Sequence, residues 1–254
     1  MAGANGTQDG DKMAPTETTV SPSSAPSTPL HNPAVNPAHL PVQSQLDLLR
    51  RILSTNPALL CVLHLTAQLR LPNWYLAGGA ISQTIWNYMS GHAPEMGIRD
   101  YDLVYYDATD LSWEAEDAVI QRARRLFQDA GGLAAAADVE IRNQARVHLW
   151  YGDKFGVECA PHGSVEAAID SWISTSAMVG VRPRLRDDDV AGEDGGDGIM
   201  DVEWDVYAPR GLSDFFNMVV RPNPVLGRRE QYMKKVVRWQ QYWDKLVIEP
   251  WPHA

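Results

Sequence analysis

The sequence predicts an α+β protein, an α/β sandwich in which a small mixed sheet is flanked by helices. Short apolar or β-branched segments alternate with segments of helical periodicity between residues 74 and 143. Two helical segments precede this alternation, and a basic amphipathic segment over residues 228–245 predicts a long C-terminal helix. The order of these segments favours one sheet surrounded by helices.

Composition divides the chain into two parts. Residues 1–42 are rich in Ala, Pro, Ser, Thr, Asn and Gly and hold few large apolar side chains, so we expect a disordered tail. Residues 43–254 have the length of a single domain. Within this domain, the acidic and glycine-rich segment at about 186–199 is expected to form a mobile loop.

Charge and hydropathy exclude two classes of partner. The formal net charge of −10 disfavours non-specific binding to nucleic acid, because the surface would repel phosphate polymers. No apolar run approaches the roughly 20 residues that a bilayer-spanning helix needs, and no signal peptide is recognisable. The two cysteines, Cys61 and Cys159, have no metal-binding or disulfide spacing. We therefore expect an intracellular, cytoplasmic protein without a membrane partner.

The domain is expected to open with two helices. Ser44 and Asp47 resemble a capping box, so the first helix is predicted over residues 44–54. Asn56 and Pro57 have the residue types of a helix cap and first helical position, and they predict the start of the second helix.

A strand, a glycine turn, a helix and a second strand are expected next. Residues 74–77 are short and apolar, as in a buried strand, and they run into Gly78 and Gly79. Residues 80–90 place their apolar side chains on one helical face, and residues 98–106 have the composition of a strand. The later elements are a helix over 113–130 capped by Ser112, strands over 139–143 and 147–151, a helix over 165–172, a hairpin of 177–182 with 201–207, and helices over 213–218 and 228–245.

Asp100 and Asp102 are the strongest candidates for metal-binding residues of an active site. They flank one residue at the start of an apolar strand, so alternation places both carboxylates on the same face. Two adjacent carboxylates repel each other unless a cation lies between them, and Mg²⁺ or Mn²⁺ prefers such oxygen ligands. Among the other acidic pairs with this spacing, those in the tail, on a helix and in the acidic loop are explained by solvent exposure, and only the Asp100 pair follows a glycine turn and a helix.

Gly78 and Gly79 are candidate phosphate-binding residues. Residues without Cβ let a phosphate approach the backbone, and the following helix N-terminus offers unpaired N–H groups. Ser82 and Gln83, in the first turn, could add polar contacts. An ordinary tight turn between strand and helix is the competing interpretation.

Glu140 is the best candidate for a third carboxylate. It alternates with apolar residues on a strand that could lie beside that of Asp102. The competing acids, Asp201, Glu203 and Asp205, share one face of a segment that is more typical of a half-exposed hairpin.

The basic and histidine side chains leave alternatives open. Arg142, Arg146 and Lys154 could meet a triphosphate, but salt bridges to neighbouring acids such as Asp138 or Glu158 explain them equally well. The basic C-terminal helix could touch RNA, although we favour a helix that lies across the domain. His148 is expected to be a satisfied strand histidine.

The order of glycine turn, helix, Asp-x-Asp strand and a strand with one more acid resembles the DNA polymerase beta-like nucleotidyltransferase superfamily. The match covers about residues 71–143, and Ala80 stands where many members carry serine. A group known only as nucleotidyltransferase family proteins is similar over more of the chain, through the stretches GAISQTIWN, IRDYDLVYYD, DLSWEAED, VEIRNQARVHLWY, VYAPRGLSD and VRPNP.

This resemblance implies an enzyme that transfers an NMP group from an NTP to a hydroxyl of an acceptor and releases pyrophosphate. It implies that Gly78 and Gly79 hold phosphates and that Asp100, Asp102 and Glu140 bind Mg²⁺ or Mn²⁺. The acceptor could be a small molecule, a protein or RNA. The alternative is a catalytically inactive scaffold that binds nucleotide or a protein partner, which we would favour if Glu140 faced away from the two aspartates.

Overall fold

The computed structural model describes residues 30–32, 34–184 and 203–252. The predicted mobile loop at 186–199 and most of the predicted tail lie outside these residues. The predicted tail boundary at residue 42 is too late, because Pro37–His39 already forms a short 3₁₀ helix and Ala38 is only 6% exposed.

Two helices open the domain. Helix α1 (Val42–Leu53) begins two residues before Ser44 and has no side-chain cap, so the predicted capping box is wrong. Helix α2 (Pro57–Gln68) begins as predicted, because the Asn56 side chain accepts a hydrogen bond from the Leu59 N–H at 3.0 Å.

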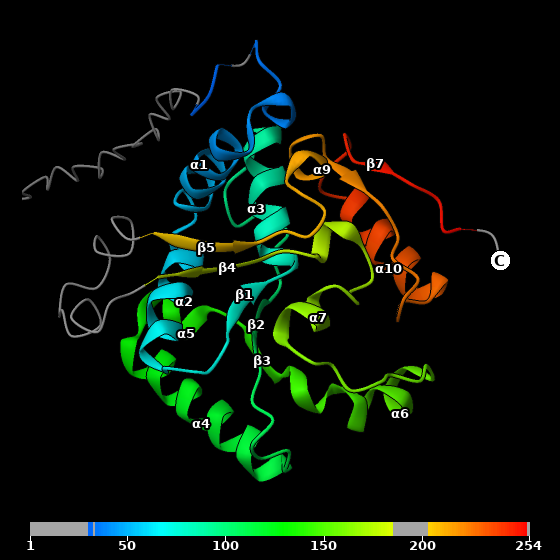
Figure 1. The fold of residues 1–254 in the computed structure, drawn as a ribbon. Helices are drawn as coiled ribbons and strands as arrows, with labels where there is room; N and C mark the ends of the chain where they lie inside the picture. Colours follow the sequence, from blue (N-terminus) through cyan, green and yellow to red (C-terminus); the bar gives the residue numbers. More distant parts are fainter. Residues whose placement is uncertain (1–29, 33, 185–202, 253–254) are drawn as a thin grey trace, which may run out of the picture.

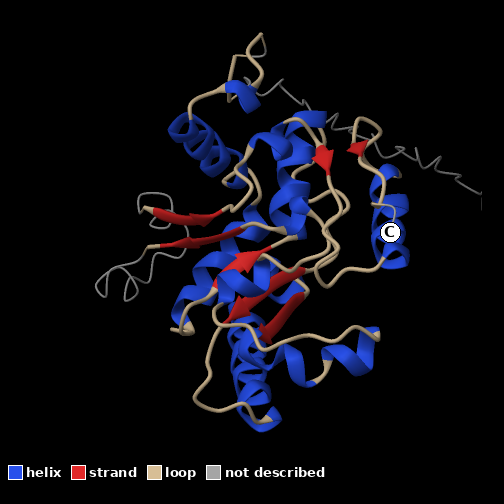
Figure 2. Ribbon diagram, turned by 45° about the vertical axis from the view of Figure 1, so that its right-hand side comes forward, coloured by secondary structure: helices blue, strands red, loops and turns tan. Residues whose placement is uncertain are grey.

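The predicted mixed sheet is confirmed. Its strand order is β3-β2-β1-β4-β5, in which β2 and β3 are parallel and the other neighbours are antiparallel (Figures 1 and 2). The strands are β1 (Tyr75–Ala77), β2 (Tyr101–Tyr105), β3 (Val139–Asn143), β4 (Gly180–Pro183) and β5 (Trp204–Tyr207). A separate pair consists of β6 (Val219–Val220) and β7 (Val247–Ile248).

The sheet separates two environments. Leu103 and its alternate neighbours Tyr101 and Tyr105 belong to the main core, together with side chains from α1, α2, α3 (Gly79–Ser90), α4 (Trp113–Ala130) and α5 (Gly132–Ala136). Val104 belongs to a smaller cluster with Val165 and Ile169 of α7 (Val165–Ile169). Figure 1 shows α2, α4 and α5 on one side of the sheet and α6, α7 and α10 on the other.

The segment after β3 departs from the prediction. A strand was expected over residues 147–151, but Gln144–Leu149 forms a 3₁₀ helix and α6 (Tyr151–Phe155) follows it. The Asn143 side chain accepts a hydrogen bond from the Ala145 N–H, which caps the 3₁₀ helix and ends the extended chain. The predicted cap Ser112 is confirmed, since its hydroxyl accepts from the Ala115 N–H.

The C-terminal segment is shorter than predicted. After η3 (Thr175–Ala177) and α9 (Ser213–Phe216), helix α10 spans Arg229–Gln240 rather than residues 228–245. It lies across the domain, as favoured, because Tyr232, Val236 and Trp239 pack in one cluster with Trp86 of α3. Within the described residues, no helix combines the length and the apolar character needed to cross a membrane.

Candidate active site

The parallel register of β2 and β3 brings two of the predicted carboxylates side by side. Asp102 lies directly opposite Glu140, and Ala77 of β1 is its neighbour on the other side. Asp100 precedes β2, because the strand begins at Tyr101 rather than at residue 98 as predicted. All three carboxylates nevertheless line one cavity of about 350 Å³.

The electrostatics of Asp102 show that the acids act on one another. Burial, together with the charges of Asp100 and Glu140, raises the pKa of Asp102 to about 7 against the opposing effects of Lys235 and Arg142. Among the described residues, the carboxylates of Asp100 and Asp102 have neither a hydrogen-bond partner nor an ion pair. A partly buried carboxylate without a donor is costly, so this pair fits a cationic ligand.

The Glu140 side chain is held by an ion pair within its own strand. Its carboxylate pairs with Arg142 at 2.8 Å, and both side chains remain partly exposed at 41% and 35%. Within the described parts of the chain, no three His, Cys, Asp or Glu side chains come close enough together to hold a metal ion. The structure therefore brings the acids to one cavity but pairs Glu140 with an arginine there.

The turn before α3 requires glycine. Gly78 has φ +74°, and its N–H donates to Val179 O at 2.9 Å. A Cβ at this position would collide with the Trp172 ring and would lie 3.3 Å from Asp102 Oδ2. Gly79 is the first residue of α3 and lines the cavity, so the unpaired N–H groups of the helix open toward the carboxylates.

Two polar side chains follow in the first turn of α3. Ser82 lines the cavity, but its hydroxyl donates to Gly79 O at 3.1 Å. Gln83, the other side chain expected to add a polar contact here, also lines the cavity. Its side chain is 2% exposed, its amide nitrogen lies 2.7 Å from where a Cβ on Gly79 would be, and its Oε1 has no hydrogen-bond partner among the described residues. This buried acceptor beside the glycine turn is available to a ligand.

Helix α10 contributes a basic wall that sequence reasoning missed. Gln231, Lys235 and Arg238 line the cavity and are spaced by four and three residues, so they share one helix face. Burial and the charge of Arg99 lower the pKa of Arg238, whereas Asp100 raises it, which places the guanidinium near that acid. The spacing was visible in the sequence, but only tertiary packing turns this face toward the acids.

Of the remaining candidates, the two basic side chains have local partners within the described residues, and the histidine does not. Arg146 pairs with the buried Glu116 rather than with Asp138 or Glu158. Lys154 lies over the Trp150 and Phe155 rings, at 5.3 and 5.2 Å from their centroids. His148 is not the satisfied strand histidine that we expected, because it lies in a 3₁₀ helix and its Nδ1 has no partner in the described chain.

Two of the three competing acids, Glu203 and Asp205, lie away from the cavity. Asp205 pairs with Arg182 and Arg184, and Glu203 pairs with Arg184. Asp205 belongs to β5 and Glu203 directly precedes this strand, which is at the opposite edge of the sheet from β3. Asp201 lies outside the described residues.

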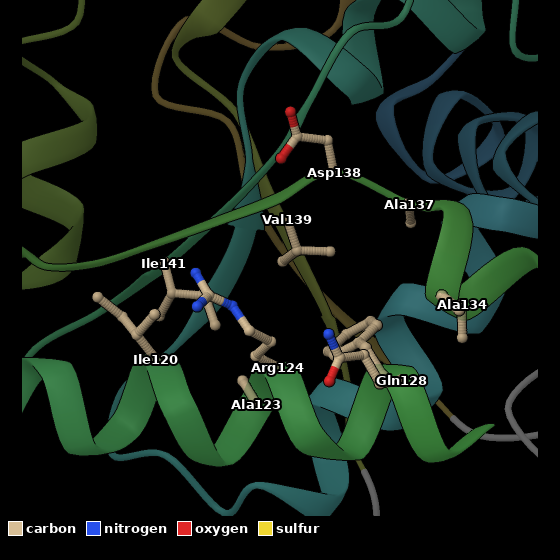
Figure 3. A pocket seen from close by; sticks show the side chains of 11 residues that line it. Ile120, Ala123, Arg124, Gln128, Ala134, Ala137, Asp138, Val139 and Ile141 are labelled. Carbon is tan, nitrogen blue, oxygen red and sulfur yellow. The ribbon is translucent and has the colours of Figure 1, made fainter. Parts of the chain in front are cut away.

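A second cavity, of about 180 Å³, lies on the other face of β3 (Figure 3). Val139 and Ile141 line it together with Ile120 and Ala123 of α4, and Arg124 and Asp138 are its charged members. Because Glu140 and Arg142 alternate with these residues, they belong to the opposite face. The second cavity therefore contains none of the three candidate carboxylates.

Comparison with known proteins agrees with this architecture. A solved NMR structure described as a CCA-adding enzyme head domain is similar to this chain with a TM-score of 0.59 and 23% sequence identity, over 82% of this chain and 96% of that chain. At this identity the likeness establishes the fold. Among curated proteins, none matches the chain. The family described as Nucleotidyltransferase matches residues 64–248, which include both glycines, all three carboxylates and α10, and the chain therefore belongs to that family of nucleotidyltransferases.

Proposed function

We propose that this protein is a nucleotidyltransferase of the polymerase beta-like type that moves an NMP group from an NTP to a hydroxyl of its acceptor. The observation that carries the proposal is the register of β2 and β3, which places Asp102 and Glu140 side by side in the cavity where α3 begins. Glu140 therefore faces the same cavity as the aspartates, which favours an enzyme over an inactive scaffold.

We propose that Asp100, Asp102 and Glu140 hold Mg²⁺ or Mn²⁺. The oxygens of Asp100 and Asp102, which have no partner in the described part of the chain, and the raised pKa of Asp102 fit divalent cations. When bound, such ions would neutralise charge on the phosphates and lower the pKa of the attacking hydroxyl. Glu140 would then exchange its pairing with Arg142 for a place in this ligand set.

The chain's own groups position the nucleotide. The N–H groups at the start of α3 would bind phosphate oxygens, with Gly78 and Gly79 keeping the approach open. Lys235 and Arg238 would complement the charge of the triphosphate. The acceptor oxygen forms a bond to the α-phosphorus as the bond to the β-phosphate oxygen breaks, and pyrophosphate leaves. The hydroxyl proton passes to a carboxylate of the site or to water.

Transfer of label tests this function. The protein is incubated with each α-³²P-labelled NTP, Mg²⁺ or Mn²⁺, and the small-molecule, protein and RNA fractions of a cell extract. We expect label in one fraction with the wild-type protein and none with Asp100→Ala/Asp102→Ala. Glu203→Gln, at the residue before the far edge strand β5, serves as the control and should label normally.

Two results would count against the proposal. Equal labelling by the wild type and the double variant would show that the chemistry lies elsewhere. Nucleotide binding by the wild type with no transfer to any fraction would favour the inactive scaffold.

A further inference from the structure

The site cavity joins two walls of different chemistry. The basic wall consists of Gln231, Lys235 and Arg238 on α10. The aromatic wall consists of Trp150, Tyr151 and Phe155, at and just before α6. Figures 1 and 2 show α6 and α10 as separate helices on the same side of the sheet. A ligand that fills the cavity therefore meets cations from one helix and ring faces from the other.

The rings of the aromatic wall are held in place by their neighbours. The Tyr151 and Phe155 centroids are 4.7 Å apart, and those of Trp150 and Phe155 are 6.3 Å apart. The Tyr151 hydroxyl donates to Leu226 O at 3.1 Å, and Arg228 donates to Gly156 O just beyond α6. All three rings are only partly buried, so they keep surface for a ligand. The wall is thus organised before any ligand binds.

We infer that the aromatic wall stacks against the nucleobase of the NTP, while the triphosphate points toward the basic wall and the start of α3. This inference rests on the proposed function, because it assigns the two ends of the nucleotide that the reaction consumes. Stacking needs only a planar π-face, which every base supplies. Lys154 also lines the cavity, where its ammonium lies over the Trp150 and Phe155 rings, and it offers a donor to ring nitrogens or carbonyl oxygens of the base.

Charge decides between this orientation and the reverse one. The reverse orientation would place the triphosphate on ring faces, whose quadrupole repels anions, with Lys154 as the cation of that wall. It would also set an uncharged base against Lys235 and Arg238. The proposed orientation instead gives the triphosphate two cations of α10 and the positive end of α3.

Equilibrium binding separates the two ends of the nucleotide without turnover. The probes are an α,β-methylene analogue of ATP and inorganic tripolyphosphate, each with Mg²⁺. We expect Trp150→Ala to bind the analogue about tenfold more weakly, because it loses one stacked ring, and to bind tripolyphosphate as the wild type does. Trp150→Phe keeps a ring and should retain most of the affinity. The matched control is Leu149→Ala, since Leu149 is 51% exposed beside Trp150 and is not among the described residues that line the cavity.

The outcomes distinguish this inference from the proposed function. If the wild type binds the analogue and Trp150→Ala binds it equally well, the base lies elsewhere and only the inference is overturned. If Trp150→Ala weakens tripolyphosphate as much as the analogue, the orientation is wrong. If the wild type binds neither probe, the proposed function is overturned and the inference with it.

Discussion

Each face of the central sheet borders a cavity. Adjacent residues of one strand lie on opposite faces, so that one packs in the core and the next lines the site cavity. Leu103 of β2 is fully buried in the main core, whereas Asp102 beside it faces the site cavity. On β3, Ile141 borders the smaller cavity and Glu140 the site cavity. The face with helices α1 to α5 stabilises the fold, which allows the other face to keep repelling carboxylates close together.

This contrast predicts that substitutions at neighbouring positions separate activity from stability. The largest effect is expected for Asp102→Asn, which keeps the shape of the side chain and removes its charge. We expect nucleotidyl transfer to fall by about 10²–10³-fold or more, because the site loses a charge that serves the transition state. The free energy of unfolding of the metal-free protein at pH 8 should not decrease, because a repelled carboxylate is removed. Transfer assays and urea unfolding measure the two quantities, and a large loss of stability would contradict the assignment.

Leu103→Ala tests the core-facing side of the sheet, at the residue next to Asp102. Leu103 is fully buried among helices and strands, so its truncation should lower the free energy of unfolding by about 2–5 kcal/mol. The protein that remains folded should keep its activity per active site, since the side chain points away from the cavity. Urea unfolding with active-site titration checks both statements. A stable but inactive Leu103→Ala protein would show that the two faces are not independent.

The raised pKa of Asp102 predicts a pH dependence of the metal-free protein. Below about pH 4 the carboxyl is protonated in both the folded and the unfolded chain. As pH rises toward 7, the unfolded chain releases this proton while the folded chain retains it, so the stability contribution is lost across this window. This pH-dependent loss of stability should be smaller than the loss caused by Leu103→Ala, because Asp102 is partly exposed and solvent screens its charge.

Unfolding in urea with EDTA at pH 5 and pH 8 measures this dependence. The wild type should lose more stability between the two values than Asp102→Asn, and Mg²⁺ should restore part of the loss at pH 8 by replacing the proton. Identical pH dependence of the two proteins would contradict the shift of this pKa.

The predictions that the structure confirms depend on adjacent residues, although some local predictions failed, and features that depend on packing could not be predicted from the sequence. The caps Asn56 and Ser112 and the alternation of Asp102 within its strand are local, and the structure places them as expected. The strand predicted at 147–151 failed because the Asn143 side chain caps a 3₁₀ helix there. The entry of Lys235 into the cavity depends on how α10 packs across the sheet, which the periodicity of one helix does not specify.

The smallest change in activity and stability is expected on substitution of the acids that were the alternative candidates for the third carboxylate. The Glu203 side chain, just before β5, is 80% exposed and pairs with Arg184, whose side chain is itself 61% exposed. Such surface pairs contribute about 0–1 kcal/mol, so Glu203→Gln should change the free energy of unfolding by less than about 1 kcal/mol. Transfer activity should stay at the wild-type value, whereas Glu140→Gln should reduce it by an order of magnitude or more. Measuring both variants under identical conditions compares the two edges of one sheet, and a larger loss at Glu203 than at Glu140 would move the third carboxylate to the β5 edge.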